Sequence, residues 1–182
     1  TAMEVAWAMR RKQHIPEGHP LRKLLRWMTE MSFDGVGLHD RQVIAYMCDM
    51  LVDFVQMDNL YPFRDAHGER LDSLVEAVHR GEAESWLSER ETHRHVGDHC
   101  MFIVGLFPES LTCRRRPLSP EYYVEKGKRS YLEVSRIDGD RPSGTLFRKM
   151  SDRFEECVVG LHLERNYLND PFYQYLMRQM LE

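Results

Sequence analysis

The sequence predicts an all-α fold, a single-domain multi-helix bundle of about six or seven helices spanning residues 3–182. Apolar residues recur at helical spacing along most of the 182-residue chain, whereas strand-like alternation bounded by hairpin turn pairs is missing. Hydrophobic residues make up 42% of the chain and charged residues 30%, a composition typical of a globular protein with one buried core. We therefore expect antiparallel helices joined by short loops.

Apolar faces and capping residues define the elements of the first half. Leucines and a methionine share one face of a helix that follows Pro20. Asp40 is a favoured N-cap residue for the next helix. The predicted elements are, in order, helices at 4–12 and 21–31, a glycine-containing turn at 33–38, a helix from 40 to about 55, a loop at 61–68 and a short helix at 71–79.

The second half carries stronger start signals. Ser119-Pro120 combines a capping residue with proline in the first turn, and Asp170-Pro171 repeats the pattern. The predicted elements are, in order, a long helix at 84–107, a helix from 120, a polar loop at 138–144, a second long helix from 143 or 145 through 161 and an amphipathic segment at 172–181. Four residues of the helix that begins at 120 are expected to face the core: Tyr123, Gly127, Tyr131 and Val134.

Three residues of the helix at 84–107 are spaced as metal ligands. Glu91, His95 and His99 follow one side of the helix at i, i+4 and i+8. A carboxylate with two imidazoles suits zinc, iron or manganese. A dimetal site would also need the Glu-x-x-His motif formed by Glu76 and His79. An exposed, charge-paired face is the favoured interpretation, because Glu91 and His95 point away from the apolar stripe. No cofactor is therefore expected.

The same helix carries polar residues at or beside its apolar stripe. His93 is interpreted as a core histidine, with haem ligation as the alternative. Gly97 and Asp98 interrupt the helix, where glycine costs about 1 kcal/mol relative to alanine. We expect Gly97 or Gly105 to allow a close helix contact and Asp98 to act as a structural polar lock. Asp98 is expected to accept a hydrogen bond from one of three groups: Tyr122, Tyr123 or an arginine.

A basic loop precedes the tyrosine-rich helix. Three consecutive arginines follow Cys113, and neighbouring positive charge lowers the pKa of a thiol. Arginines in a loop also bind phosphate or carboxylate groups. The alternative is a solvated loop whose arginines pair with nearby glutamates. The predicted surface for a ligand or partner comprises Arg114, Arg115, Arg116, Tyr122, Tyr123 and Lys126.

Charge and cysteine usage exclude several classes of partner. The net charge of −4 gives no general attraction to nucleic acid or anionic membranes, and no apolar run approaches the roughly 20 residues that a membrane span needs. Four cysteines without a C-x-x-C pair indicate a reducing cytoplasm. We expect no secretory signal, and Thr1-Ala2 before Met3 is interpreted as a cloning remnant. The apolar segment at 172–181 either packs on the core or forms a homodimer contact.

Two adjacent segments carry a resemblance. Residues 97–109 read G-D-x-x-x-F-x-x-G-L-F-P-E, and residues 122–131 read Y-Y-x-x-x-G-K-x-S-Y. This pattern resembles one in uncharacterised bacterial all-helical proteins. The resemblance implies a bacterial, cytoplasmic, helical protein, and it assigns no functional residue.

The residues favour a non-catalytic binding or regulatory module. No complete catalytic set is visible, whereas a basic loop and an aromatic helix are adjacent. The module is expected to engage a protein or a small anionic ligand. The alternative hypotheses are a metal-dependent helical enzyme that uses Glu91, His95 and His99, and a redox sensor built on Cys113.

Overall fold

The computed structural model describes residues 15–60, 88–111, 119–171, 174–175 and 178–179. Within these ranges every regular element is helical, so the predicted all-α multi-helix bundle is confirmed. The elements are, in order, α2 (Pro20–Gly35), α3 (Arg41–Leu60), α5 (Glu89–Leu106), the short 3-10 helix η1 (Pro108–Leu111), α6 (Pro120–Asp138), α7 (Pro142–Asp152) and α8 (Phe154–Asn169). The elements predicted at 4–12, 61–68 and 71–79, and most of 172–181, lie outside the described residues.

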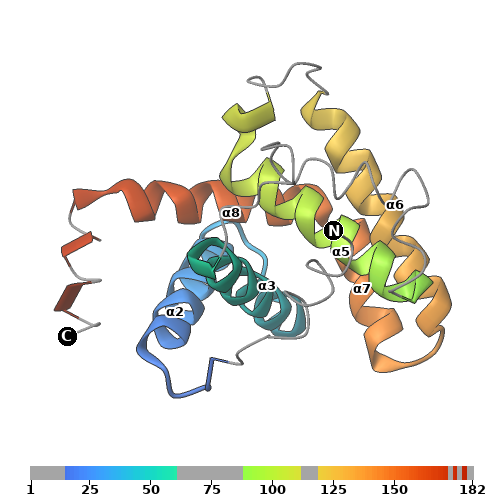
Figure 1. Ribbon diagram of the computed structural model, residues 1–182, viewed down its shortest axis with the longest axis horizontal. Helices are drawn as coiled ribbons and strands as arrows, with labels where there is room; N and C mark the ends of the chain where they lie inside the picture. Colours follow the sequence, from blue (N-terminus) through green and yellow to red (C-terminus); the bar gives the residue numbers. More distant parts are fainter. Residues whose placement is uncertain (1–14, 61–87, 112–118, 172–173, 176–177, 180–182) are drawn as a thin grey trace.

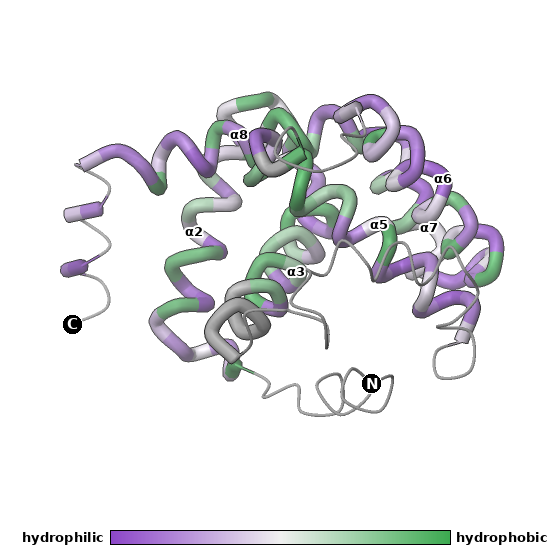
Figure 2. Tube along the Cα trace, turned by 45° about the horizontal axis from the view of Figure 1, so that its top comes forward, coloured by the Kyte–Doolittle hydropathy of each residue, from purple (hydrophilic) through white to green (hydrophobic). Residues whose placement is uncertain are grey.

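Helix α8 connects two groups of helices. α2 and α3 pack together on one side, α5, α6 and α7 on the other, and α8 contacts both α2 and α5 (Figure 1). The C-terminal part of α8 extends past α2, and its residues are mostly hydrophilic (Figure 2). Apolar side chains from all these helices form one core cluster. The contacts of α8 with both groups place it at the junction of the bundle.

The predicted start signals are confirmed at two helices. The Asp40 carboxylate accepts hydrogen bonds from the backbone N–H groups of Gln42 at 3.0 Å and Val43 at 3.3 Å. The Ser119 hydroxyl accepts from the N–H of Tyr122 at 3.3 Å, with Pro120 in the first turn of α6. In both cases the side chain supplies the partner that the first turn of a helix lacks. All four residues predicted to face the core from α6 are buried.

The predicted start of the long helix at 84 was wrong. Ser88 has an extended backbone, and its hydroxyl accepts from the N–H of Glu91 at 3.3 Å, so α5 begins at Glu89. The helical period of this segment places Phe107 on the apolar stripe and leaves Met101 off it, yet Met101 is fully buried and Phe107 is 43% exposed.

The long helix predicted from 143 or 145 through 161 is two helices. Arg153, with φ −109° and ψ 22°, separates α7 from α8. The break carries neither glycine nor proline. Phe154, the first residue of α8, is fully buried and packs against Gly127 of α6, where a Cβ would lie 2.4 Å from its ring. Tertiary packing of that ring therefore accompanies a bend that local propensity does not predict.

Two predicted loops are shorter than expected. α2 continues to Gly35, which leaves Val36 and Gly37 as the turn, and Gly37 has a φ of 77° that suits glycine. Asp138 still belongs to α6, and α7 already begins at Pro142. Proline at the first helical position lacks only an N–H that would be unpaired there in any case. The loop after α6 is thereby reduced to three residues, 139–141.

Candidate functional site

The first turns of α6 carry the described part of the predicted ligand surface. Tyr122 is 40% exposed, whereas Tyr123 is buried. Their rings meet edge to face with centroids 5.7 Å apart. Lys126 lies one turn further along, and its Nζ is 5.8 Å from the centre of the Tyr122 ring. We call these three residues the Lys126 site.

The ammonium group of Lys126 is buried, and no hydrogen-bond acceptor for it is found in the described part of the chain. Burial lowers the pKa of this lysine to about 8. With that pKa the group is still mostly charged at neutral pH. A buried ammonium without an acceptor is unfavourable, because the protein has not replaced the hydrogen bonds that water supplied. An anionic oxygen would replace them.

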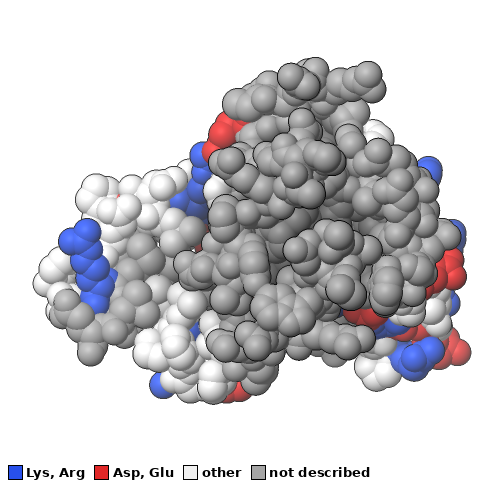
Figure 3. Space-filling model, viewed as in Figure 1, with Lys and Arg blue, Asp and Glu red and all other residues white. Residues whose placement is uncertain are grey.

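Two other cations of α6 are paired with carboxylates at the surface. Lys128 donates to Glu155 at 2.7 Å, and Arg136 donates to Glu133 at 2.5 Å. Acidic and basic side chains alternate along this edge of the molecule (Figure 3). Lys126 therefore differs from Lys128 and Arg136, because its Nζ is buried and has no described carboxylate partner.

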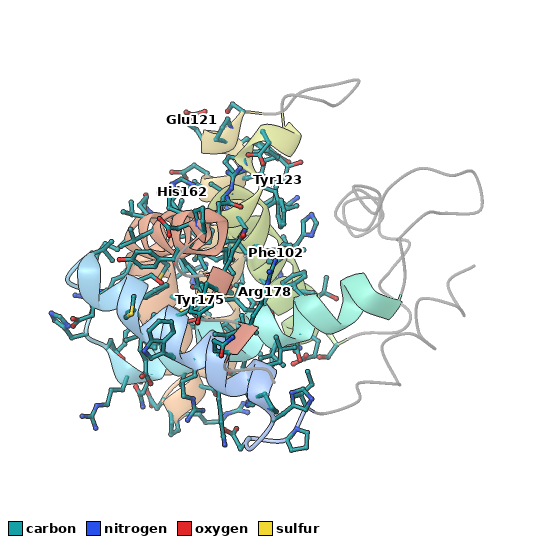
Figure 4. The ribbon with its side chains drawn as sticks, turned by 90° about the vertical axis from the view of Figure 1, so that its left-hand side faces the viewer. Phe102, Glu121, Tyr123, His162, Tyr175 and Arg178 are labelled. Carbon is teal, nitrogen blue, oxygen red and sulfur yellow. The ribbon has the colours of Figure 1, made fainter. Side chains whose placement is uncertain are left out.

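The amino-terminal end of α6 is already supplied with an anion. Glu121, which precedes the buried Tyr123 on this helix (Figure 4), is fully exposed, and its own backbone N–H and the Ser119 hydroxyl lower the pKa of its carboxyl group. The partial positive charge at the amino-terminal end of α6 is therefore already compensated by a carboxylate of the same helix. Lys126, in the second turn, carries a buried Nζ without a described hydrogen-bond partner.

The basic loop lies outside the described residues. Cys113, Arg114, Arg115 and Arg116 fall in the segment 112–118 that joins η1 to α6, so their predicted roles stay predictions. The described cysteines, at 48, 100 and 157, are buried thiols. Burial raises the pKa of Cys48 to about 11 and that of Cys157 to about 12, which makes both thiols poor nucleophiles.

The carboxylate of the predicted ligand Glu91 is paired with two arginines. Its Oε1 accepts from Arg90 Nη1 at 2.5 Å, and its Oε2 accepts from Arg94 Nε at 3.0 Å. Partial burial alone would raise the pKa of Glu91, yet the two guanidinium groups lower it. Any metal bound here would have to compete with both arginines for these oxygens.

The two histidines of the predicted metal site lie on the same helix. His95 and His99 are both half-buried. Among the described residues, no group of three or more His, Cys, Asp or Glu side chains is arranged to hold a metal ion. Glu76 and His79 lie outside those residues. The metal site stays a prediction.

Asp98 lies at the centre of a buried cluster that joins three helices. Its Oδ1 accepts from the hydroxyls of Tyr46 on α3 at 2.6 Å and Tyr131 on α6 at 2.9 Å. Its Oδ2 accepts from Arg94 Nη1 at 3.3 Å. Burial raises the pKa of Asp98, whereas these three donors favour the charged form. The arginine partner agrees with the expectation, but the tyrosines are Tyr46 and Tyr131 and not Tyr122 or Tyr123.

The hydrogen bonds continue along α5 beyond Asp98. Arg94 also binds Glu91, which binds Arg90. Arg90 in turn donates twice to the carboxylate of Asp138, at 2.6 and 2.7 Å. A bidentate pair of this kind is geometrically specific. The series of alternating charges thus ties α5 to α3 at one end and to the end of α6 at the other, which suits a structural role.

Two residues of interest were missed from the sequence. Tyr46 was not recognised as a partner of Asp98, and the two residues are 52 positions apart. Glu164 was overlooked, although it follows Cys157 by seven positions and Leu161 by three and so shares their apolar face. An acidic residue on an otherwise apolar helix face indicates a buried carboxyl group, and this signal was present in the sequence.

Comparison with protein-family models, curated proteins and solved structures found no match to this chain. No described helix is long and apolar enough to cross a membrane. The function of the chain therefore has to be inferred from its own residues.

Proposed function

We propose that the chain is a non-catalytic helical module that binds a small anionic ligand at the Lys126 site. The supporting observation is the buried Nζ of Lys126, for which no acceptor is found among the described residues. A carboxylate or phosphate oxygen of the ligand would accept its hydrogen bonds and neutralise its charge. An acidic side chain of a partner protein offers the same chemistry in a second form.

The aromatic neighbours support binding of a small ligand. The Tyr122 ring stabilises the ammonium group through its negative face but leaves its N–H donors unsatisfied. Tyr122 is 40% exposed, so the side of the site that this ring forms borders solvent. Sites for small molecules combine apolar walls with few polar groups in this way. In this proposal Arg114, Arg115 and Arg116 add positive charge to the approach.

Anion binding by matched variants tests the proposal. Phosphate, citrate and a phosphorylated sugar are titrated into the protein while its thermal unfolding is followed. Lys126→Met is the test variant and Lys128→Met the control, because Lys128 is paired with Glu155 at the surface. We expect at least one anion to raise the melting temperature of the wild type and of Lys128→Met, and to bind Lys126→Met at least about tenfold more weakly.

The proposal fails if none of the anions binds the wild type, or if Lys126→Met binds as tightly as Lys128→Met does. Charge reversal at residues 114–116 tests the contribution of the basic loop in the same assay. A cytoplasmic location, a bacterial source and a homodimer contact through 172–181 belong to the same proposal, and nucleic acid is not an expected partner. The metal-dependent enzyme and the Cys113 redox sensor remain the alternative hypotheses.

A further inference from the structure

The seam between α2 and α8 contains a buried carboxyl group. Gly160 of α8 faces Phe33 of α2, where a Cβ would lie 2.7 Å from the phenyl ring. One turn further along α8, Glu164 lies 3.2 Å from the hydroxyl of Thr29 on α2. Glu164 is 1% exposed and Thr29 is fully buried. The carboxyl group therefore lies in the contact between the two helices and not at its rim.

Hydrogen-bond stoichiometry indicates the protonation state of this carboxyl group. The Thr29 hydroxyl lies 2.7 Å from the backbone carbonyl oxygen of Leu25, which can only accept. A hydroxyl carries one proton, so Thr29 cannot fully donate to both Leu25 and Glu164. If Thr29 donates to Leu25, the bond to Glu164 requires a carboxyl proton. The other oxygen of Glu164, Oε2, has no hydrogen-bond partner among the described residues. Both observations suit a neutral acid.

Charged groups of α2 and α3 act on the Cys48 thiol of α3. Arg22, Arg26, Asp49 and Glu164 all influence the ionisation of the Cys48 thiol. The pKa of that thiol is raised to about 11, so it stays neutral through the mildly alkaline range. The pKa of Glu164 itself is raised to about 8 by burial, and the Thr29 hydroxyl is the smaller, opposing influence.

The ionisable neighbours of Glu164 on α8 face elsewhere. His162, labelled in Figure 4, has its Nε2 3.0 Å from the backbone carbonyl oxygen of Val104 on α5. Arg165 forms two hydrogen bonds with the carboxylate of Glu109, at 2.8 and 2.9 Å. No cation is thus placed to stabilise a Glu164 carboxylate among the described contacts of this seam.

We propose that Glu164 is a proton-operated clasp, which holds α8 against α2 while it is protonated and loosens this seam when it ionises. Its pKa in the folded chain lies above the value of 4.5 for an ordinary glutamate. The stability that the proton confers is therefore fully present below about pH 4.5 and is lost as the pH rises through about 8. Between these values the folded chain holds one more proton than the unfolded chain. The folding equilibrium constant then falls about tenfold per pH unit on account of this group.

Denaturant unfolding as a function of pH tests the clasp. Wild type, Glu164→Gln and the control Glu156→Gln are compared from about pH 5.5 to about pH 7, where the single-proton slope is expected. Glu156 lies on the same helix and is exposed. Glutamine keeps the shape of the neutral acid but cannot ionise. We expect the tenfold fall per pH unit in the wild type and in Glu156→Gln, and its loss in Glu164→Gln. A wild-type slope in Glu164→Gln would overturn the proposal.

Two further measurements on the wild type cover the case in which Glu164→Gln does not fold. Carboxyl ¹³C chemical shifts follow the ionisation of individual glutamates, and the Glu164 signal is expected to titrate near pH 8. Titration at an ordinary glutamate pKa would overturn the clasp. Amide hydrogen exchange is expected to become faster in α2 and α8 than in α6 once the carboxyl group ionises, after correction for intrinsic exchange. Equal changes in all three helices would also contradict the proposal.

Discussion

The ring of Tyr131 lies against Gly97, and its hydroxyl donates to Asp98, the next residue along α5. A Cβ at position 97 would lie 2.6 Å from two carbons of this ring. The hydroxyl-to-carboxylate distance is 2.9 Å. The glycine therefore makes room for the ring, and the aspartate satisfies the buried hydroxyl. One aromatic side chain accounts for both residues that interrupt the apolar pattern of α5.

Gly97→Ala is predicted to destabilise the chain. Alanine has the better helix propensity, by about 1 kcal/mol. The added methyl group cannot fit unless the fully buried Tyr131 ring moves, and overpacking of this kind costs typically about 1–3 kcal/mol. The free energy of unfolding in denaturant is the measurement. Gly18→Ala is the control, because nothing lies within 4 Å of a Cβ at that position. A Gly97→Ala variant more stable than wild type would contradict the contact.

The two tyrosines on Asp98 are predicted to act non-additively. Tyr46→Phe and Tyr131→Phe each remove one donor to Oδ1, and each loss is expected to cost about 1–2 kcal/mol. In each single variant the other hydroxyl still donates to the same oxygen. The double variant leaves that oxygen without either tyrosine in a buried position, so its cost should exceed the sum of the single costs. A double-mutant cycle in denaturant measures this difference. Strict additivity would show that the two hydrogen bonds are energetically independent.

The sequence predicted elements whose signals are local. Asp40 and Ser119 were recognised as caps because a capping side chain bonds within its own first turn. The buried face of α6 followed from its helical period. The break at Arg153 was missed because the apolar period continues across it, and it coincides with the packing of Phe154 against a different helix.

The sequence predicted the region of the candidate site but not the burial or the hydrogen bonding of its residues. Adjacent positive charges and tyrosines in the sequence pointed to Lys126 and Tyr122. Whether a lysine is buried, and whether it meets an acceptor, depends on side chains brought together by the fold. The same holds for Asp98, whose partner Tyr46 comes from α3. Residue type and spacing identified the groups, and the tertiary contacts determine which of them lack a partner.

Removal of the buried ammonium at Lys126 is predicted to raise or preserve stability while it abolishes anion binding. The pKa of this lysine is about 8 in the folded chain, below the value of 10.5 for an ordinary lysine. Between these values the unfolded chain binds one more proton, so this group makes the wild type more stable as the pH rises from about 8 to about 10.5. Lys126→Met should lack this increase, and at neutral pH it should be at least as stable as wild type.

The same ionisation is predicted to control ligand affinity. A bound anion favours the charged ammonium group, so binding should be accompanied by proton uptake and should weaken as the pH rises through about 8. Calorimetric titration of the best anion from about pH 6.5 to about pH 9.5, in buffers of different ionisation enthalpy, measures both effects. A lysine that merely fills space in the structure would give neither. An affinity that stays constant over this range, or a Lys126→Met variant clearly less stable than wild type, would show that the buried ammonium is a structural group.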